Sequence, residues 1–98
     1  MIFSIEAEQA VCGGLLVDPE KLTEVLELIN YQDFYSARLK TIFHCIHSLA
    51  ASGHQIDVIT VSESLSAGDT LESAGGYQYI LQLASEITGT SNLVATQN

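Results

Sequence analysis

Apolar residues recur at steps of three and four positions along most of this sequence, which is the spacing of one face of an α-helix. The clearest case is the stretch from Ser36 to Ser52, whose polar residues fall on the opposite face. Four further stretches, 4–17, 18–30, 60–67 and 77–88, carry the same spacing and are also predicted helices. The apolar stripe of the 36–52 helix consists of Leu39, Ile42, Phe43, Ile46, Leu49 and Ala50.

Residues with strong positional preferences mark where these helices begin and end. Ser4, followed by acidic residues, is a helix N-cap, and Asp18-Pro19 combines a capping residue with a proline suited to the first helical position. Asn30 ends the second helix, and a short aromatic connection, 31–35, follows it. Gly53 stands where a left-handed C-cap is expected after the 36–52 helix.

The run from Ile56 to Val61 is ambiguous, because its β-branched residues favour a strand. A competing signal is Thr60 with Glu63, which fits a capping box at the start of a helix. We therefore expect an extended segment up to Ile59 and then a short helix that ends at Gly68.

The last helix, 77–88, has two apolar strips, and the sequence does not decide between two roles for the second one. The main strip consists of Tyr77, Ile80, Leu81, Ala84 and Ile87, which predicts the buried face. Tyr79 and Leu83 lie off it, as Leu16 and Val17 do on the first helix; they either pack within the monomer or form a partner-binding face. Leu93 to Ala95 resembles the first turn of a further helix.

The glycine pair Gly13-Gly14 lies inside the first predicted helix, where each glycine costs about 1 kcal/mol relative to alanine. Close approach of a neighbouring helix would compensate for this cost.

Together these elements predict an all-α fold, a small globular bundle of about five to six short helices in a single domain over residues 1–98.

The charge balance limits the partners of this domain. Lys and Arg number 3 against 12 Asp and Glu in 98 residues, a net charge of −9. Three scattered cations form no basic patch, so direct binding of nucleic acid or of an anionic membrane surface is not expected. The acidic N-terminus matches neither a signal peptide nor a membrane span. Two cysteines are too few for a disulfide scaffold, so we expect the protein to be in a reducing compartment, the cytoplasm.

No pattern typical of an enzyme is present. A phosphate-binding P-loop needs a lysine after glycine, which neither Lys21 nor Lys40 provides. Paired carboxylates for acid–base catalysis would have to share a cleft, whereas six glutamates fall on predicted outer helix faces, where they promote solubility: Glu6, Glu8, Glu20, Glu24, Glu27 and Glu63. Metal binding by His44, His47 and Cys45 is the weakest hypothesis, because no second ligand pair accompanies them.

Several segments in one order resemble the N-terminal domain of bacterial and phage replicative DNA helicases of the DnaB type. The resemblance extends from Ser4 to about Ala84. The matching segments are Ser4 to Val11, Gly13, Asp18-Pro19, Asp33 to Tyr35, Ile42-Phe43, Gly53, Ile56 to Val61, Leu65, Leu71-Glu72, Gly75-Gly76 and Tyr79-Ile80.

This resemblance implies a non-catalytic domain of a hexameric helicase. In that family the N-terminal domains of the six subunits, together with a helical hairpin that follows each of them, form a collar on the hexamer. The C-terminal domain of primase docks on this collar. The ATP- and magnesium-dependent motor is a separate C-terminal domain, so the resemblance implies no cofactor for these 98 residues. Glu6 and Tyr79 match positions of the primase-facing surface and are the expected partner-binding residues. Neighbouring subunits and a helicase loader are further partners of the family, and these residues alone would form a monomer or dimer.

A second hypothesis is a stand-alone helical adaptor or regulator that binds primase or the helicase loader. A motor sequence in the same gene would favour the helicase, and a stop codon the adaptor.

Overall fold

A computed structural model describes residues 4–29 and 31–88, and within them every regular element is helical. The all-α fold class is therefore confirmed. Two single-turn 3₁₀ helices, η1 (Pro19–Lys21) and η2 (Tyr31–Asp33), flank the second α-helix. The α-helices are α1 (Ile5–Val17), α2 (Leu22–Leu28), α3 (Ala37–Ala51), α4 (Val58–Ala67) and α5 (Gly76–Thr88).

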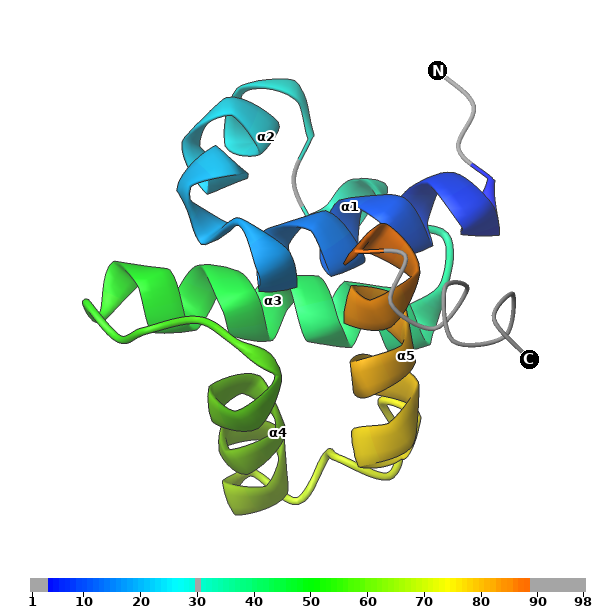
Figure 1. Ribbon diagram of the computed structural model, residues 1–98, viewed down its shortest axis with the longest axis vertical. Coiled ribbons are helices and arrows are strands. Elements are labelled where there is room, and N and C mark those ends of the chain that lie inside the picture. The colour runs from blue at the N-terminus through cyan, green and yellow to red at the C-terminus, as the bar shows by residue number, and fades with distance from the viewer. Residues whose placement is uncertain (1–3, 30, 89–98) are drawn as a thin grey trace.

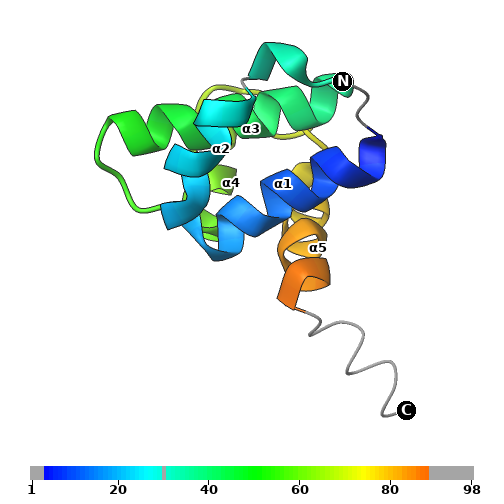
Figure 2. The same ribbon diagram turned by 90° about the horizontal axis from the view of Figure 1, so that it is seen from above.

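Helix α3 runs through the middle of the molecule, with α1 and α2 on one side and α4 on the other (Figure 1). Helix α5 packs against both α1 and α4. Seen from above, α1 lies between α3 and the C-terminal end of α5 (Figure 2). The predicted stripe of α3 supplies the centre of the core, since Leu39, Ile42, Phe43 and Ile46 are all fully buried.

Helices α1 and α5 approach each other closely at Gly13. A Cβ atom there would overlap the backbone carbonyl of Leu83 and lie 2.8 Å from Cγ1 of Ile87. The predicted close approach is thus confirmed for Gly13. It is wrong for Gly14, where a Cβ would meet nothing within 4 Å.

Glu8 is buried, so the prediction that it lies on an outer helix face is wrong. Its side chain is 1% exposed and accepts two backbone hydrogen bonds, from Tyr35 N at 2.7 Å and from Ser36 N at 3.0 Å. Ser36 is the N-cap of α3, so the Glu8 carboxylate joins α1 to the positive end of the α3 dipole. The buried residues of α1 are Glu8, Cys12, Gly13, Leu15 and Leu16.

The second helix is shorter than the sequence predicts. The Asp18 carboxylate makes no capping bond, and Pro19 begins a 3₁₀ turn before α2. Helix α2 ends at Leu28, with Ile29 as its C-cap, while the predicted stop at Asn30 lies outside the described residues. Gly53 has φ +77° just after α3, which confirms the left-handed residue expected there.

Helix α4 begins at Val58, two residues before the predicted start. Its capping box is formed by Asp57 and Thr60: Thr60 N donates to Asp57 Oδ1 at 2.8 Å, and Asp57 N donates to Thr60 Oγ1 at 2.9 Å. Thr60 is therefore the third residue of the helix, in a capping box whose N-cap is Asp57. It is not itself the N-cap of a capping box with Glu63. An aspartate carboxylate is at least as good an N-cap as a threonine hydroxyl, which favours the earlier start.

Helix α5 buries only part of the predicted strip, since Ile80 is buried and Ala84 packs against the core. Ile80 and Leu83 are buried, whereas Tyr77, Leu81 and Ile87 are 42%, 37% and 43% exposed. Of the residues that could either pack within the monomer or bind a partner, Leu83 and Leu16 are buried and therefore belong to the core. The segment from Leu93 to Ala95 lies outside the described residues.

Candidate interaction surface

Glu6 lies on the first turn of α1, exposed at the rim of a hollow between α1 and α5. The hollow has a volume of about 400 Å³. Its apolar lining comes from Ala10, Leu83 and the partly exposed Ile87. A second exposed carboxylate, Glu86, lies on the α5 side and accepts a hydrogen bond from Gln82 Nε2 at 3.1 Å. The hollow therefore has an acidic rim above apolar side chains.

Tyr79 is half-buried and held on several sides. A Cβ added to Gly75 would lie 2.7 Å from Cδ2 of the ring, so this ring packs directly on the glycine backbone. The guanidinium carbon of Arg38 lies 4.8 Å from the ring centroid. The hydroxyl accepts a hydrogen bond from Gln9 Nε2 at 3.3 Å. These contacts fix the position of the ring, so its exposed parts have a defined orientation.

Gln9 connects the two residues predicted from the sequence. It lines the hollow beside Glu6 and donates to the Tyr79 hydroxyl. The fold thus brings Glu6 and Tyr79, 73 positions apart in the sequence, onto one surface. We call this surface the α1–α5 face; it comprises Glu6, Gln9, Arg38, Tyr79, Glu86 and Ile87.

Sequence reasoning missed Arg38, Gln9 and Glu86 as members of this face. Arg38 is one of only three cations in the sequence, which is the one signal that could have drawn attention to it. Gln9 and Glu86 carry no such signal, because their positions depend on how α1 and α5 cross.

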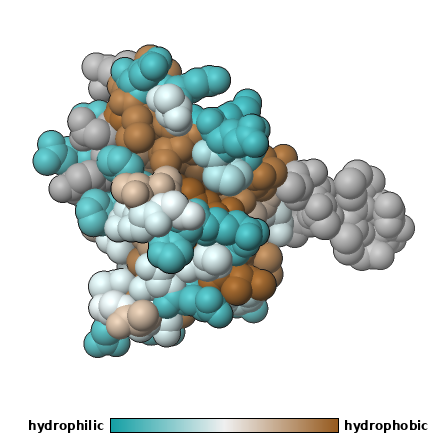
Figure 3. All heavy atoms as spheres, turned by 90° about the vertical axis from the view of Figure 1, so that its left-hand side faces the viewer, coloured by the Kyte–Doolittle hydropathy of each residue, from teal (hydrophilic) through white to brown (hydrophobic). Residues whose placement is uncertain are grey.

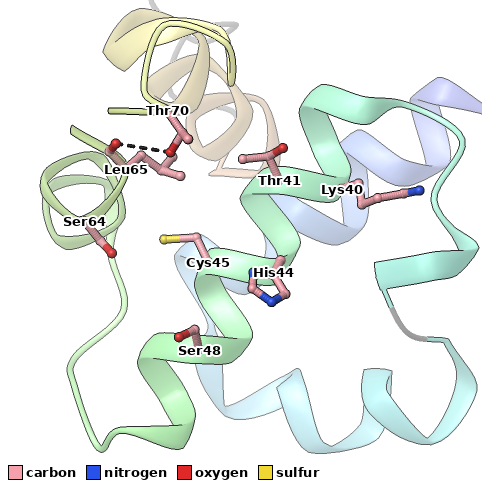
Figure 4. A pocket seen from close by; sticks show the side chains of 8 residues that line it. All are labelled: Lys40, Thr41, His44, Cys45, Ser48, Ser64, Leu65 and Thr70. Atoms are coloured by element: carbon pink, nitrogen blue, oxygen red, sulfur yellow. Dashed lines mark hydrogen bonds between the residues drawn. The ribbon is translucent and has the colours of Figure 1, made fainter. Parts of the chain in front are cut away.

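A second hollow, of about 470 Å³, lies between α3 and α4 (Figure 4). It contains Cys45, whose thiol points toward Ser64, while His44 points in another direction on the same helix. Across residues 4–29 and 31–88 no three metal-ligating side chains come together. The sequence-based metal hypothesis therefore gains no support from the arrangement of His44 and Cys45.

Both cysteines behave as buried core residues. Burial and the nearby Glu8 carboxylate raise the pKa of the Cys12 thiol well above its usual range, and the thiol donates to the Leu39 carbonyl at 3.6 Å. Burial also raises the pKa of the Cys45 thiol, and a hydrogen bond with the Ser64 side chain lowers this pKa to a smaller extent. The Cys45 thiol donates to the Val61 carbonyl at 3.9 Å. A neutral thiol is a poor nucleophile, so neither residue is suited to covalent catalysis.

The face seen from the side of α2 and α4 combines hydrophobic and hydrophilic areas (Figure 3). Leu28 on α2 is 79% exposed and lines neither of the two hollows described above. In the part of the protein that the structure describes, no helix is both long and apolar enough to cross a bilayer. The α1–α5 face remains the surface where a hollow, charged groups and an oriented aromatic ring coincide.

Comparison with known proteins places the chain in a family. Residues 1–98 match the family model described as the DnaB-like helicase N terminal domain. The replicative DNA helicase DnaB of Geobacillus stearothermophilus is 39% identical over 90 residues, which is 92% of this chain and 20% of the relative. The corresponding helicase of Rhodothermus marinus is 33% identical over 90 residues, 92% of this chain and 10% of the relative. The chain thus spans a fifth or less of the length of these two relatives.

A solved structure has the same fold. The N-terminal domain of DnaB helicase from Mycobacterium tuberculosis superimposes with a TM-score of 0.81 at 32% identity. The match covers 84% of this chain and 57% of that one.

Proposed function

Because the chain belongs to the DnaB-like helicase N-terminal domain family, we propose that it is a non-catalytic protein-interaction domain of a replicative helicase. In this proposal its α1–α5 face docks the C-terminal domain of primase at the replication fork. The complete helicase unwinds DNA in the cytoplasm with ATP and magnesium bound to a motor domain that these 98 residues do not include. Contacts with neighbouring subunits in the collar of a hexamer, and with a helicase loader, belong to the same proposal.

The observation that carries the proposal is that Gln9, which lines the same hollow as Glu6, donates a hydrogen bond to the Tyr79 hydroxyl. The resemblance singles out Glu6 and Tyr79 without regard to the distance between them in space. Their convergence beside a hollow with apolar lining supports a common role in binding, since protein interfaces combine an aromatic or apolar centre with a polar rim. The Tyr79 ring, held by Gly75, Arg38 and Gln9, loses little conformational entropy when a partner covers it.

The charge of the domain supports a protein partner over DNA. A net charge of −9 repels the phosphate backbone, and only three cations are present to offset it. A protein partner with basic side chains would be attracted by the same charge, which increases the rate of association.

Replacing Glu6 by alanine tests the proposed docking. We expect the dissociation constant for the matching primase C-terminal domain to rise about threefold to fivefold, because an exposed rim charge contributes modestly to binding. Isothermal titration calorimetry with the purified 98-residue protein measures this change. Glu6 is a better target than Tyr79, whose ring packs against the core and whose removal would also affect folding.

Glu63 on α4 provides the matched control, since it is an exposed carboxylate outside the α1–α5 face. Glu63→Ala removes the same charge and should change the dissociation constant by less than about twofold. Absence of any complex with the unmodified protein would refute primase docking by this domain. Equal effects of the two substitutions would show that Glu6 acts only through net charge.

A further inference from the structure

Arg38 is an isolated cation in a strongly acidic molecule. It is the second residue of α3, and its side chain is exposed. The protein has 12 carboxylate residues, yet across residues 4–29 and 31–88 none forms a salt bridge with Arg38, and its guanidinium lies over the ring of Tyr79. A cation on such a surface would gain from an acidic neighbour, so its position over an aromatic ring requires an explanation.

The stacked position orients the guanidinium group. A guanidinium that lies over an aromatic ring is attracted to it through one planar face, while the N–H donors at its edge stay available. The ring beneath is itself fixed by the Gly75 backbone and by the hydrogen bond from Gln9. Arg38 is therefore held in place before any partner binds, so that little side-chain entropy is lost when its edge meets a ligand.

The edge of a guanidinium matches a carboxylate, which it binds through two parallel hydrogen bonds. We propose that Arg38, stacked on Tyr79, is the receptor for a carboxylate that the protein partner presents to the α1–α5 face. The inference rests on the proposed docking function and adds the chemistry of the partner: an aspartate, a glutamate or a C-terminal carboxylate opposite Arg38.

The order of charges across the face gives this contact a second role. Glu6 and Glu86 lie together at the hollow, Gln9 connects the hollow to Tyr79, and Arg38 lies over Tyr79. The face thus carries negative charge at the hollow and positive charge over the Tyr79 ring. A partner with the opposite order of charges can dock in one orientation, because the reversed orientation places like charges together.

A nucleic acid or a free anion fits this position poorly. A single cation on a face that also carries Glu6 and Glu86 cannot offset the repulsion that a polyanion would meet there. Lys40, only two residues further along α3, lines the other hollow, between α3 and α4. The two cations of α3 therefore serve different surfaces, which makes Lys40 the natural control for Arg38.

The test is calorimetric titration of the 98-residue protein with the matching primase C-terminal domain. Arg38→Ala should weaken binding about tenfold or more, because a pre-oriented bidentate ion pair lies at the upper end of interface contributions. Arg38→Lys keeps the charge but loses the planar edge and should recover only part of that loss. Lys40→Ala removes the same charge and should stay within about twofold of the unmodified protein.

A second measurement identifies the carboxylate itself. Each exposed Asp or Glu of the primase domain is replaced by Asn or Gln and titrated against the unmodified protein and against Arg38→Ala. One replacement should weaken binding to the unmodified protein and have no further effect on Arg38→Ala, which is the signature of a direct pair in a double-mutant cycle. Thermal unfolding of Arg38→Ala near that of the unmodified protein shows that the loss does not come from a collapse of Tyr79.

The outcomes separate this inference from the function on which it rests. If the unmodified protein binds and Arg38→Ala binds equally well, or if no carboxylate of the partner is coupled to Arg38, the carboxylate receptor is refuted while docking stands. If the unmodified protein forms no complex with the primase domain, both proposals are refuted.

Discussion

Replacing Glu8 by alanine is expected to lower the free energy of unfolding by about 3 kcal/mol, a large part of the stability of a small domain. The carboxylate accepts the backbone N–H groups of Tyr35 and Ser36 and is 1% exposed. Its removal leaves two donors without their partner at the start of α3 and a cavity between α1 and α3. Glu8→Gln keeps one acceptor oxygen and should cost less.

Urea unfolding followed by circular dichroism measures the effect. Glu6→Ala is the matched control, since Glu6 lies two residues away on the exposed side of the same turn. It should change the unfolding free energy by no more than about 0.5 kcal/mol. If Glu8→Ala were as stable as Glu6→Ala, the buried carboxylate would have no structural role and the interpretation of the α1–α3 contact would be wrong.

Gly13→Ala is expected to destabilise the domain by about 2–3 kcal/mol, because the added methyl group meets an atom that cannot easily move. That atom is the backbone carbonyl oxygen of Leu83, and Cγ1 of Ile87 is also only 2.8 Å away. Relief would require α5 to move away from α1, which would also disturb the hollow of the α1–α5 face.

The next residue gives the opposite expectation. A methyl group at Gly14 meets nothing within 4 Å, so Gly14→Ala should stabilise the domain by about 0.5–1 kcal/mol through helix propensity alone. Thermal or urea unfolding of the two variants side by side checks the sign of each change. Two effects of the same sign would contradict the close packing of α1 on α5 at Gly13.

The parts of the fold that the sequence predicts well are those where one signal dominates. Helix α3 has a complete apolar stripe, and the predicted helix is confirmed. Position 53 is a glycine, the residue type that tolerates positive φ without strain, and the predicted left-handed conformation there is also confirmed. On α1 the apolar residues lie on all sides of the helix, and on α5 they form an apolar side that is wider than the part that is buried, so the period alone does not determine which of them are buried. That choice is made by tertiary contacts: the Glu8 carboxylate binds the start of α3, and the backbone carbonyl of Leu83 lies against Gly13.

Local signals that compete are difficult to rank from the sequence. Asp57 and Thr60 can each cap a helix, and the structure uses Asp57 as the cap and Thr60 as its partner. The sequence alone assigns Glu8 to the surface because glutamate is rarely buried, a rule that fails where backbone donors satisfy the carboxylate.

The candidate site could be predicted only in part. Resemblance pointed to Glu6 and Tyr79, but nothing in the residues themselves indicates that they share a surface. The hydrogen bond from Gln9 to Tyr79, and the position of Arg38 over the ring, arise where α1, α3 and α5 converge. Contacts between residues about 70 positions apart depend on the packing of whole helices, which a local pattern does not encode.

The central claim is that the α1–α5 face binds primase, and nuclear magnetic resonance mapping tests it most directly. The ¹⁵N-labelled protein is titrated with the unlabelled primase C-terminal domain, and the backbone and Arg38 side-chain signals are followed. We expect the largest shifts at Glu6, Gln9, Tyr79, Glu86 and Arg38, with small shifts at Ser48 and Ser64 of the other hollow. Shifts confined to α2 or to the hollow between α3 and α4, or no shifts at saturating partner, would contradict the claim.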